Sequence, residues 1–488
     1  MSCRNNRLIT TLAIVLSSTL LGQAPDTLWT KTYGSTRDAI LFSIDQTADG
    51  GFIMSGSVGL FADSSVFWLV RTKADGDTLW TRTYGDPDSN NICQSGLLTF
   101  DGGYIMAGLG GMWLIKTDAD GDTLWTRRTG GPGGQEPVMV AQTADSGYII
   151  TGNIAEAGLN AQLGLIKTDS QGNTQWTKTC GGPGDEFGGF VQQTADSGYI
   201  ILGTIIGEGG VGRDIWLLKA DAEGDTTWTT TFTLGEGEPN VVRQTADSGY
   251  AIFGLIQGTL DAPVTGGDDR DWLLIKTNNL GNLEWSRTYG GDLQDQSMDM
   301  ILTGDGGFLL TGFLDLTASG NSVDLWLVRV DSLGDTLWTT TVGDAADDGG
   351  LGLVQIAEGE YAVAGFTGSF DAGEIDGWLV RFGDVVISVA EKPATPTVFA
   401  LHANYPNPFN PTTTIGFELP VAAVVTLTVY DILGQEVRRL ANRTMGAGYH
   451  QADWDGRTSD GREAPTGIYF AQLVTPTSTR AIKMVLLK

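Results

Sequence analysis

The chain has 488 residues, of which 41% are hydrophobic, so a large core can form and a wholly disordered chain is excluded. Its 58 Asp and Glu outnumber its 29 Lys and Arg, which argues against a nucleic-acid partner, because a phosphate backbone requires clustered cations. His402 and His450 are the only histidines, so catalysis or metal binding by histidine is excluded from the first 400 residues.

The N-terminus has the pattern of a secretory signal peptide. Arg4 and Arg7 precede a largely apolar run, Leu8–Leu21, and Gly22–Ala24 supplies small residues for cleavage. A membrane anchor is the alternative, but the run is shorter than the ~20 apolar residues of a spanning helix. We predict a signal peptide over residues 1–24 and no transmembrane segment elsewhere.

Three short motifs recur along residues 25–383, about every 51 residues, with seven copies of each. They are Gln-Thr-Ala-Asp-Gly-Gly-Tyr, Trp-Leu-Leu-Lys and Thr-Leu-Trp-Thr, or near variants. Asp-Gly pairs between apolar runs indicate tight hairpins, and continuous apolar runs indicate strands covered on both faces. Each repeat therefore predicts four short strands. The tryptophans of the third motif are Trp29, Trp80, Trp125, Trp176, Trp228, Trp285 and Trp338.

The order of the motifs at the two ends predicts a closed ring. The region opens with a fourth strand alone, Asp26–Tyr33, and ends with a third strand alone, Trp378–Phe382. In a ring these two segments complete one blade and leave no free edge. We predict an all-β fold with a seven-bladed β-propeller over residues 25–383, and an open β-solenoid is the alternative. The repeats resemble those of secreted bacterial propellers.

The turns and the aromatic residues of the repeats could each bind a ligand. Asp118–Asp122 has the acidic spacing of a calcium loop. Its middle acid is replaced in equivalent turns, whereas the glycine persists, so we predict a structural turn and no cofactor, with calcium in one or two turns left open. The recurring Trp and Tyr favour packing between blades over a ladder for sugars. The replacing residues are Gln171, Glu223, Leu280 and Leu333.

The loop Gln257–Asp271 departs most from the repeat, and its acids Asp261, Asp268, Asp269 and Asp271 are candidate ligand-binding residues. No nucleophile elbow, phosphate loop or dinucleotide fingerprint occurs. We therefore expect a monomeric, non-enzymatic binding or scaffold module for an extracellular protein or glycan. A carboxylate-dependent, glycan-active enzyme with paired acids in a central cleft is the alternative.

Cys93 and Cys180 are the cysteines that remain after signal removal. They fall at non-equivalent positions of different repeats, and two such residues do not form a disulfide framework. We expect two unpaired thiols.

The composition changes near residue 384. Residues 384–398 resemble a linker, and residues 399–488 contain about seven short strand-like segments, which predict a small immunoglobulin-like β-sandwich. This part is nearly neutral, with 9 Lys and Arg and 8 Asp and Glu from residue 388 onward. The strong acidity of the chain therefore belongs to the repeats.

The motifs of residues 399–488 resemble the type A C-terminal sorting domain of the type IX secretion system. That resemblance implies Sec export, recognition by the type IX translocon, and release or attachment at the outer-membrane surface. An ordinary immunoglobulin-like adhesive domain is the alternative. The matching residues are Tyr405, Pro406, Asn407, Pro408, Phe409, Asn410, Pro411, Tyr430, Asp431, Gly434, Trp454, Asp455, Gly456, Gly467, Ile468, Tyr469, Lys483 and Met484.

Overall fold

The chain divides into two compact units, Met1–Val385 and Val386–Lys488. No helix in the described part of the chain is long and apolar enough to cross a membrane. The predicted signal peptide lies almost entirely outside the described residues. The computed structural model describes residues 24–34, 37–60, 64–85, 90–109, 113–128, 136–154, 161–181, 185–206, 212–234, 237–259, 262–263, 270–290, 294–315, 322–370, 375–383, 399–401, 404, 409 and 411–486.

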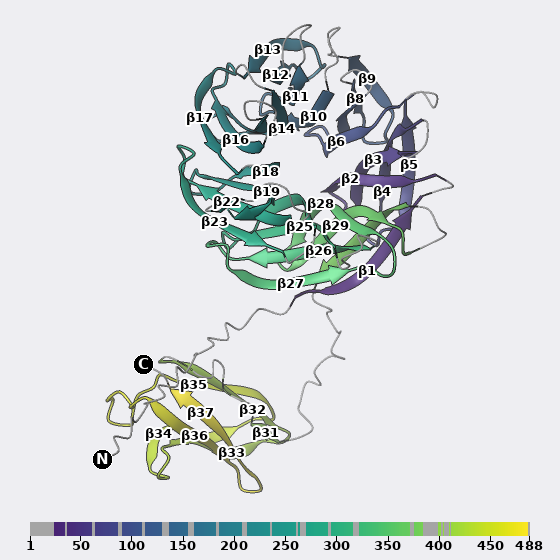
Figure 1. The fold of residues 1–488 in the computed structure, drawn as a ribbon. Helices are drawn as coiled ribbons and strands as arrows, with labels where there is room; N and C mark the ends of the chain where they lie inside the picture. Colours follow the sequence, from purple (N-terminus) through teal and green to yellow (C-terminus); the bar gives the residue numbers. More distant parts are fainter. Residues whose placement is uncertain are drawn as a thin grey trace, which may run out of the picture. The chain divides into compact units, whose positions relative to one another are not determined.

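The described residues of the first unit form seven four-stranded antiparallel sheets around a central axis (Figure 1). The predicted seven-bladed propeller is confirmed. The first three blades, from the innermost strand outward, are β2 (Ala39–Gln46), β3 (Phe52–Val58), β4 (Val66–Thr72) and β5 (Thr78–Tyr84); β6 (Cys93–Leu98), β7 (Tyr104–Gly108), β8 (Trp113–Thr117) and β9 (Thr123–Arg128); and β10 (Glu136–Gln142), β11 (Tyr148–Ile154), β12 (Gln162–Thr168) and β13 (Thr174–Cys180).

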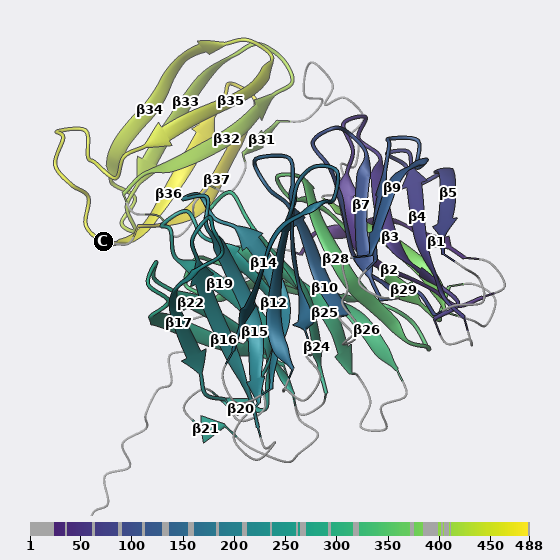
Figure 2. The ribbon, with the colours of Figure 1, turned by 90° about the horizontal axis from the view of Figure 1, so that it is seen from above.

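The next three blades repeat this order, and the fifth carries an additional two-stranded hairpin that stands off the ends of the blades (Figure 2). Its strands are β20 (Gly258–Thr259) and β21 (Ala262–Pro263). The blades are β14 (Glu186–Gln193), β15 (Tyr199–Ile206), β16 (Arg213–Ala220) and β17 (Thr226–Phe232); β18 (Glu238–Gln244), β19 (Tyr250–Ile256), β22 (Asp271–Thr277) and β23 (Leu283–Tyr289); and β24 (Gln296–Leu302), β25 (Phe308–Asp315), β26 (Val323–Val330) and β27 (Thr336–Val342).

The seventh blade joins the two ends of the propeller. Its order is β28 (Asp348–Ala357), β29 (Glu360–Thr367), β30 (Asp376–Gly383) and β1 (Asp26–Tyr33). β1 pairs with β30 in an antiparallel register that runs from Asp26 opposite Gly383 to Tyr33 opposite Gly377. The predicted closure by the N-terminal strand is therefore confirmed, and β30 has a partner on both sides.

Aromatic contacts join each blade to the next. The Trp of an outermost strand meets the aromatic residue that begins the second strand of the following blade, as Trp80 does with Tyr104 at a centroid distance of 6.0 Å. This confirms the packing interpretation of the aromatic series. The pairs around the ring are Trp29–Phe52, Trp80–Tyr104, Trp125–Tyr148, Trp176–Tyr199, Trp228–Tyr250, Trp285–Phe308 and Trp338–Tyr361.

The persistent glycine of the Asp-rich turns has two physical reasons. Gly121 has a φ of 80°, which favours glycine, and a Cβ there would lie 2.9 Å from the ring of Trp80 in the preceding blade. The first acid of the same turn, Asp118, accepts hydrogen bonds from the amides of Asp120 and Asp122, at 3.0 and 2.9 Å. The turn is therefore built by its own carboxylate and glycine, as the structural interpretation predicted.

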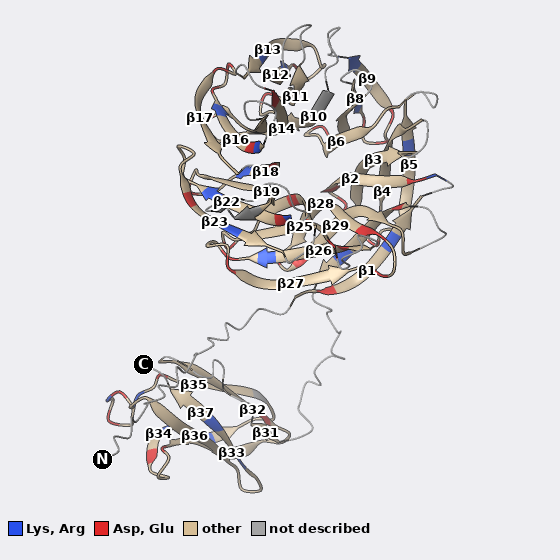
Figure 3. Ribbon diagram, viewed as in Figure 1, with Lys and Arg blue, Asp and Glu red and all other residues tan. Residues whose placement is uncertain are grey.

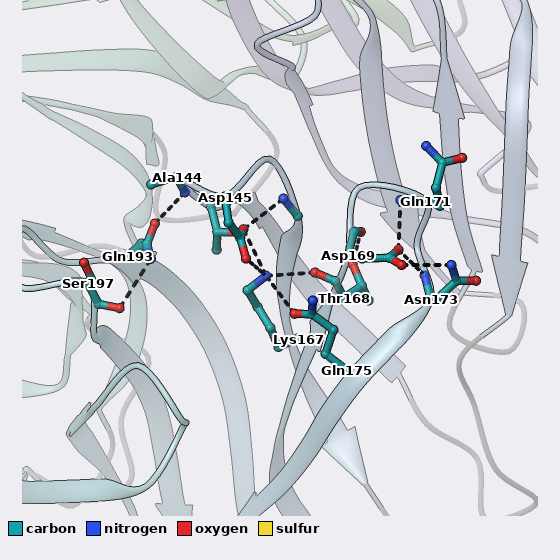
Figure 4. A network of polar contacts seen from close by, with 12 residues as sticks. Ala144, Asp145, Lys167, Thr168, Asp169, Gln171, Asn173, Gln175, Gln193 and Ser197 are labelled. Atoms are coloured by element: carbon teal, nitrogen blue, oxygen red, sulfur yellow. Dashed lines mark hydrogen bonds and ion pairs between the residues drawn. The ribbon is translucent and has the colours of Figure 1, made fainter.

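A buried cation supports the hairpin between the first and second strands of a blade. Figure 4 shows Lys167 of β12, which donates to the Asp145 carboxylate at 2.8 Å and to the Thr168 carbonyl at 2.8 Å. In the first blade, hydrogen bonds from Thr47 and Arg71 lower the pKa of Asp49 to about 2. The basic residue of the Trp-Leu-Leu-Lys motif thus ties the third strand to this hairpin.

Each innermost strand carries a β-bulge, an extra residue that shifts its register against the second strand. In every blade the second-strand residue beside the bulge is glycine. A Cβ on Gly312 would lie 1.9 Å from the carbonyl oxygen of Gln296, so only glycine lets the backbone approach this closely. The seven extra residues are Phe42, Gln94, Val138, Gly189, Asn240, Met298 and Leu351.

The second unit is a small immunoglobulin-like β-sandwich. One sheet has the order β31-β32-β35 and the other β34-β33-β36-β37. Trp454, Tyr469 and Phe409 lie in the core between them. The strands are β31 (Ala400–Leu401), β32 (Thr413–Leu419), β33 (Ala423–Tyr430), β34 (Glu436–Met445), β35 (Gly448–Trp454), β36 (Gly467–Val474) and β37 (Thr479–Leu486).

Candidate functional site in the central channel

The innermost strands of all seven blades surround one cavity of about 760 Å³, which we call the channel. Apart from Pro239, which precedes the bulge of β18, its lining residues run in each strand from the bulge toward the hairpin that follows. Six bulge residues line it, namely Phe42, Gln94, Gly189, Asn240, Met298 and Leu351. Five of these bulges therefore place an additional side chain on the channel wall, whereas Gly189 adds backbone alone, and the five side chains differ from blade to blade.

The channel wall is mainly apolar. Leu97, Met139, Val241, Ile301 and Val354 come from five different blades and line the cavity. A cavity of this size with apolar walls and a few convergent polar groups has the character of a small-molecule site. What distinguishes the wall is a set of three charged side chains on β2, β18 and β24.

Arg243 and Asp299 form an ion pair in the channel. The Arg243 Nη2 atom lies 3.1 Å from Asp299 Oδ1, and its guanidinium lies over the Phe190 ring, 4.6 Å from the centroid. Asp299 also accepts hydrogen bonds from the amides of Met300 at 2.8 Å and Leu353 at 3.1 Å. Burial raises the pKa of Asp299, and Arg243 opposes this shift. Both ends of the pair are thus fixed by neighbouring blades.

Asp45 is the third charged residue of the channel. Its Oδ2 atom accepts a hydrogen bond of 2.7 Å from the Leu98 amide of the second blade. Burial raises the pKa of Asp45 to about 6; the Leu98 hydrogen bond opposes this rise, and the Asp299 charge adds to it. Above pH 6 Asp45 is therefore mostly ionised, and it adds a negative charge to a channel that also holds the Arg243–Asp299 pair.

The sequence analysis did not identify these three residues as candidates. However, two of them occupy a position of the repeat that varies from blade to blade. The residue immediately before the Gln-Thr pair, or its equivalent, differs in every blade, whereas the residues after it recur. Asp45 and Arg243 both occupy this position. In blade order the residues there are Asp45, Leu97, Ala141, Gln192, Arg243, Ile301 and Val354.

None of the described residues of the predicted ligand loop lines the channel. Asp271 begins β22 and is not among the residues that line the cavity. Asp261, Asp268 and Asp269 lie outside the described residues, so the prediction for them is untested. Figure 3 shows that acidic and basic residues are distributed over blades around the whole ring.

Two smaller cavities, of about 510 and 430 Å³, lie at equivalent places between neighbouring blades. Each contains one of the hairpin ion pairs, Lys219–Asp196 or Lys116–Asp101, with N–O distances of 3.0 and 2.9 Å. Their charged groups already stabilise the blades, which makes these cavities weaker candidates than the channel. No described group of three His, Cys, Asp or Glu side chains could hold a metal ion.

The two propeller thiols are free, as predicted, and both are buried. Burial raises the pKa of Cys93 to about 12, so its thiol stays protonated at neutral pH. Neither thiol lines the channel.

The residues of the predicted sorting motif fall into two groups. Phe409, Trp454, Tyr469 and Met484 are buried in the sandwich core, where Trp454 and Tyr469 meet edge to face at 4.9 Å. Asp431, Asp455, Gly434 and Gly456 shape turns, since Asp431 accepts the amides of Leu433 and Gln435 at 2.9 Å, Asp455 accepts that of Arg457 at 3.1 Å, and both glycines have positive φ.

The remaining motif residues lie on strands or outside the described part. Gly467 and Ile468 begin β36, Lys483 lies on β37, and Tyr430 ends β33 opposite Phe470. Pro411 precedes β32. Tyr405, Pro406, Asn407, Pro408 and Asn410 lie outside the described residues.

Comparison with known proteins supports the fold of the second unit. Residues 404–478 match the FlgD Ig-like domain family. None of the curated proteins matches the chain.

Similar solved structures include PorZ, a surface component of the type-IX secretion system of Porphyromonas gingivalis, with 12% identity over 94% of this chain and a TM-score of 0.41. The chain spans 60% of the length of PorZ. The Neurospora crassa Pan2 WD40 domain has 10% identity, with coverage of 73% and 95% and a TM-score of 0.47. An extracellular domain of a two-component system from B. thetaiotaomicron has 9% identity, with coverage of 92% and 68% and a TM-score of 0.30. At these identities the likenesses concern the fold alone.

Proposed function

We propose that this is an extracellular binding protein whose propeller holds its ligand in the central channel. The observation that supports this function is the 760 Å³ cavity, with a mainly apolar wall and three charged side chains held on different blades. Rigid strands position these groups, which reduces the ordering that a ligand must impose when it binds. The variable bulge residues give the wall a distinct chemistry in five of the blades, while the aromatic contacts between blades stay the same.

The contacts of Asp299 favour a binding function and argue against the alternative, a glycan-active enzyme. Glycoside hydrolysis needs one carboxyl group as acid and a second that is free to act as nucleophile or base. Asp45 and Asp299 are paired acids in a central cavity, as that alternative requires. However, Asp299 accepts two backbone amides and the Arg243 guanidinium, so its oxygens are already engaged.

Filling the channel should abolish ligand binding. We expect Leu97→Trp to weaken binding at least tenfold on glycan and peptide arrays, because the indole would occupy the cavity. Leu124→Trp is the matched control, since Leu124 is 57% exposed on β9, outside the channel. Ile301→Trp repeats the test from another blade, and melting temperatures check that each variant is folded.

Unchanged binding by folded Leu97→Trp and Ile301→Trp proteins would contradict a channel site. Turnover of a polysaccharide by the native protein, lost in Asp299→Asn, would instead establish the enzyme alternative.

We further propose that the C-terminal unit directs export through the type IX system, after Sec export by the N-terminal signal. The motif series of residues 405–484 supports this route, and so does an exposed apolar surface on the unit. Ile432 and Leu433 are 68% and 76% exposed in the turn after β33, and Ile468 and Phe470 are 39% and 40% exposed on β36. β33 and β36 are neighbouring strands, with Tyr430 opposite Phe470, and exposed apolar groups on neighbouring elements are typical of interaction sites.

A reporter that carries a signal peptide and residues 384–488 should cross the outer membrane of a host with a type IX system. Truncation after Phe382 should leave a folded propeller in the periplasm. Leu433→Ser should reduce export several-fold by removing an exposed contact. Val421→Ser is its control, because Val421 is 66% exposed before the opposite end of β33. Normal surface delivery of the truncated protein would instead favour the adhesive-domain alternative.

A further inference from the structure

Among the charged residues that line the channel, Asp45 is the one without a charged partner in the described structure. Its contact is the 2.7 Å hydrogen bond from the Leu98 amide. Arg243, the cation of the lining, is already paired with Asp299 at 3.1 Å and covers the Phe190 ring. A carboxylate in a mainly apolar cavity is costly unless an opposite charge compensates it. A cationic ligand would supply that compensation.

The elements packed around Asp45 offer no such cation. The neighbouring innermost strands β6 and β28 contribute Leu97, Gln94, Leu353, Val354 and Gln355 to the cavity, and none of these side chains ionises. A small adjoining cavity places Tyr104 of β7 near Asp45. Burial raises the pKa of Tyr104, so its phenol stays neutral at neutral pH. Across the channel, Arg243 is paired with Asp299 at 3.1 Å and is therefore not available to Asp45.

We propose that the channel binds an ammonium group carried on an apolar chain, with the ammonium on Asp45 and the chain along the apolar wall. This inference rests on the proposed function of the channel as a ligand site. An ammonium donates up to three hydrogen bonds and forms a charge-assisted contact with a carboxylate. An apolar anion is disfavoured, because Arg243 is already occupied and two carboxylates face the cavity. The ammonium can belong to a free amine or to a lysine side chain.

The ligand should bind less tightly as the pH falls. The pKa of Asp45 is raised to about 6 by burial, so the carboxylate is ionised at pH 7.5 and becomes protonated below pH 6. A cation favours the ionised form, which means that protons and ligand compete for Asp45. Affinity should be level above about pH 7 and fall by about tenfold per pH unit well below the pKa.

The test uses the full chain and three probes of equal length: hexylammonium, hexanol and hexanoate. Ligand-observed NMR at pH 7.5 should give hexylammonium at least tenfold tighter binding than either other probe. Acetyl-Leu-Lys-Leu-amide, against its norleucine analogue, shows whether a lysine side chain can supply the ammonium. Asp45→Asn should remove the preference for hexylammonium over hexanol and the pH dependence of hexylammonium binding between pH 5 and 8.

Asp120→Asn is the matched control, because Asp120 is an exposed turn acid outside the channel. Equal binding of hexylammonium and hexanol, or an unchanged hexylammonium affinity in Asp45→Asn, would overturn the inference. Hexanol or hexanoate binding that Leu97→Trp abolishes would, in that case, still support the channel as a ligand site. The experiment thus distinguishes failure of the ammonium proposal from failure of the channel as a ligand site.

Discussion

Deletion of β1 (Asp26–Tyr33) should destabilise the propeller by about 5 kcal/mol or more, or cause it to aggregate. The deletion removes the ladder from Asp26 to Tyr33 along β30 and leaves the edge of β30 unpaired. It also removes Trp29, which packs on Phe52 at 6.3 Å, and the 2.6 Å hydrogen bond from Tyr33 to the Gly76 carbonyl. The seventh blade and its junction with the first are therefore lost together.

Urea unfolding followed by tryptophan fluorescence would measure this loss, with light scattering to detect aggregation. Truncation after Gly383 is the matched control, because it removes the separate C-terminal unit and leaves both partners of the β1–β30 pair. Trp29→Ala should account for about 3 kcal/mol of the effect, as expected for a large aromatic packed at an interface. An unchanged unfolding midpoint in the β1 deletion would show that this strand does not hold the ring closed.

Gly312→Ala should lower the free energy of unfolding by about 3 kcal/mol. The added Cβ would lie 1.9 Å from the Gln296 carbonyl and 2.8 Å from the ring of Trp272, and backbone cannot yield as a flexible side chain can. The bulge that carries Met298 into the channel wall would have to shift. The urea concentration at the midpoint of unfolding should therefore fall, and the affinity for the channel ligand should change as well.

Gly304→Ala is the control in the same blade. A Cβ on Gly304 meets nothing within 4 Å, and its φ is not in the left-handed region, so the change should stay within about 0.5 kcal/mol. If the two alanine variants unfold at the same urea concentration, the close approach at the bulge is not what selects glycine.

The sequence predicted the scaffold well because the recurring residues are those that hold the blades together. Trp80 recurs since it packs on Tyr104 of the next blade, and Gly121 recurs since it must fit beneath Trp80. The contact between Trp and the aromatic residue repeats seven times and the glycine contact six times, so their spacing reveals the number of blades and the closure. The buried cation Lys167 recurs for the same reason, because every such hairpin needs an equivalent support.

The channel site could not be predicted in the same way. Its charged residues come from the first, fifth and sixth blades, and nothing local in the sequence brings Asp45 toward Asp299 or Arg243. The bulges were also missed, because one extra residue in a short strand leaves the apolar pattern almost unchanged. The loop Gln257–Asp271 is the most evident departure from the repeat, whereas the variable position before Gln-Thr marks two of the channel charges.

The pairing of β1 with β30 in the seventh blade also determines how the propeller responds to mechanical load. The chain leaves the ring after Gly383, so tension on the C-terminal segment acts first on β30. This strand lies between β1 and β29, and to pull it out would break two ladders at once. A strand at a free edge would peel from a single neighbour. The N-terminal strand thus doubles the number of hydrogen-bonded ladders that a force on the C-terminal end of β30 must break.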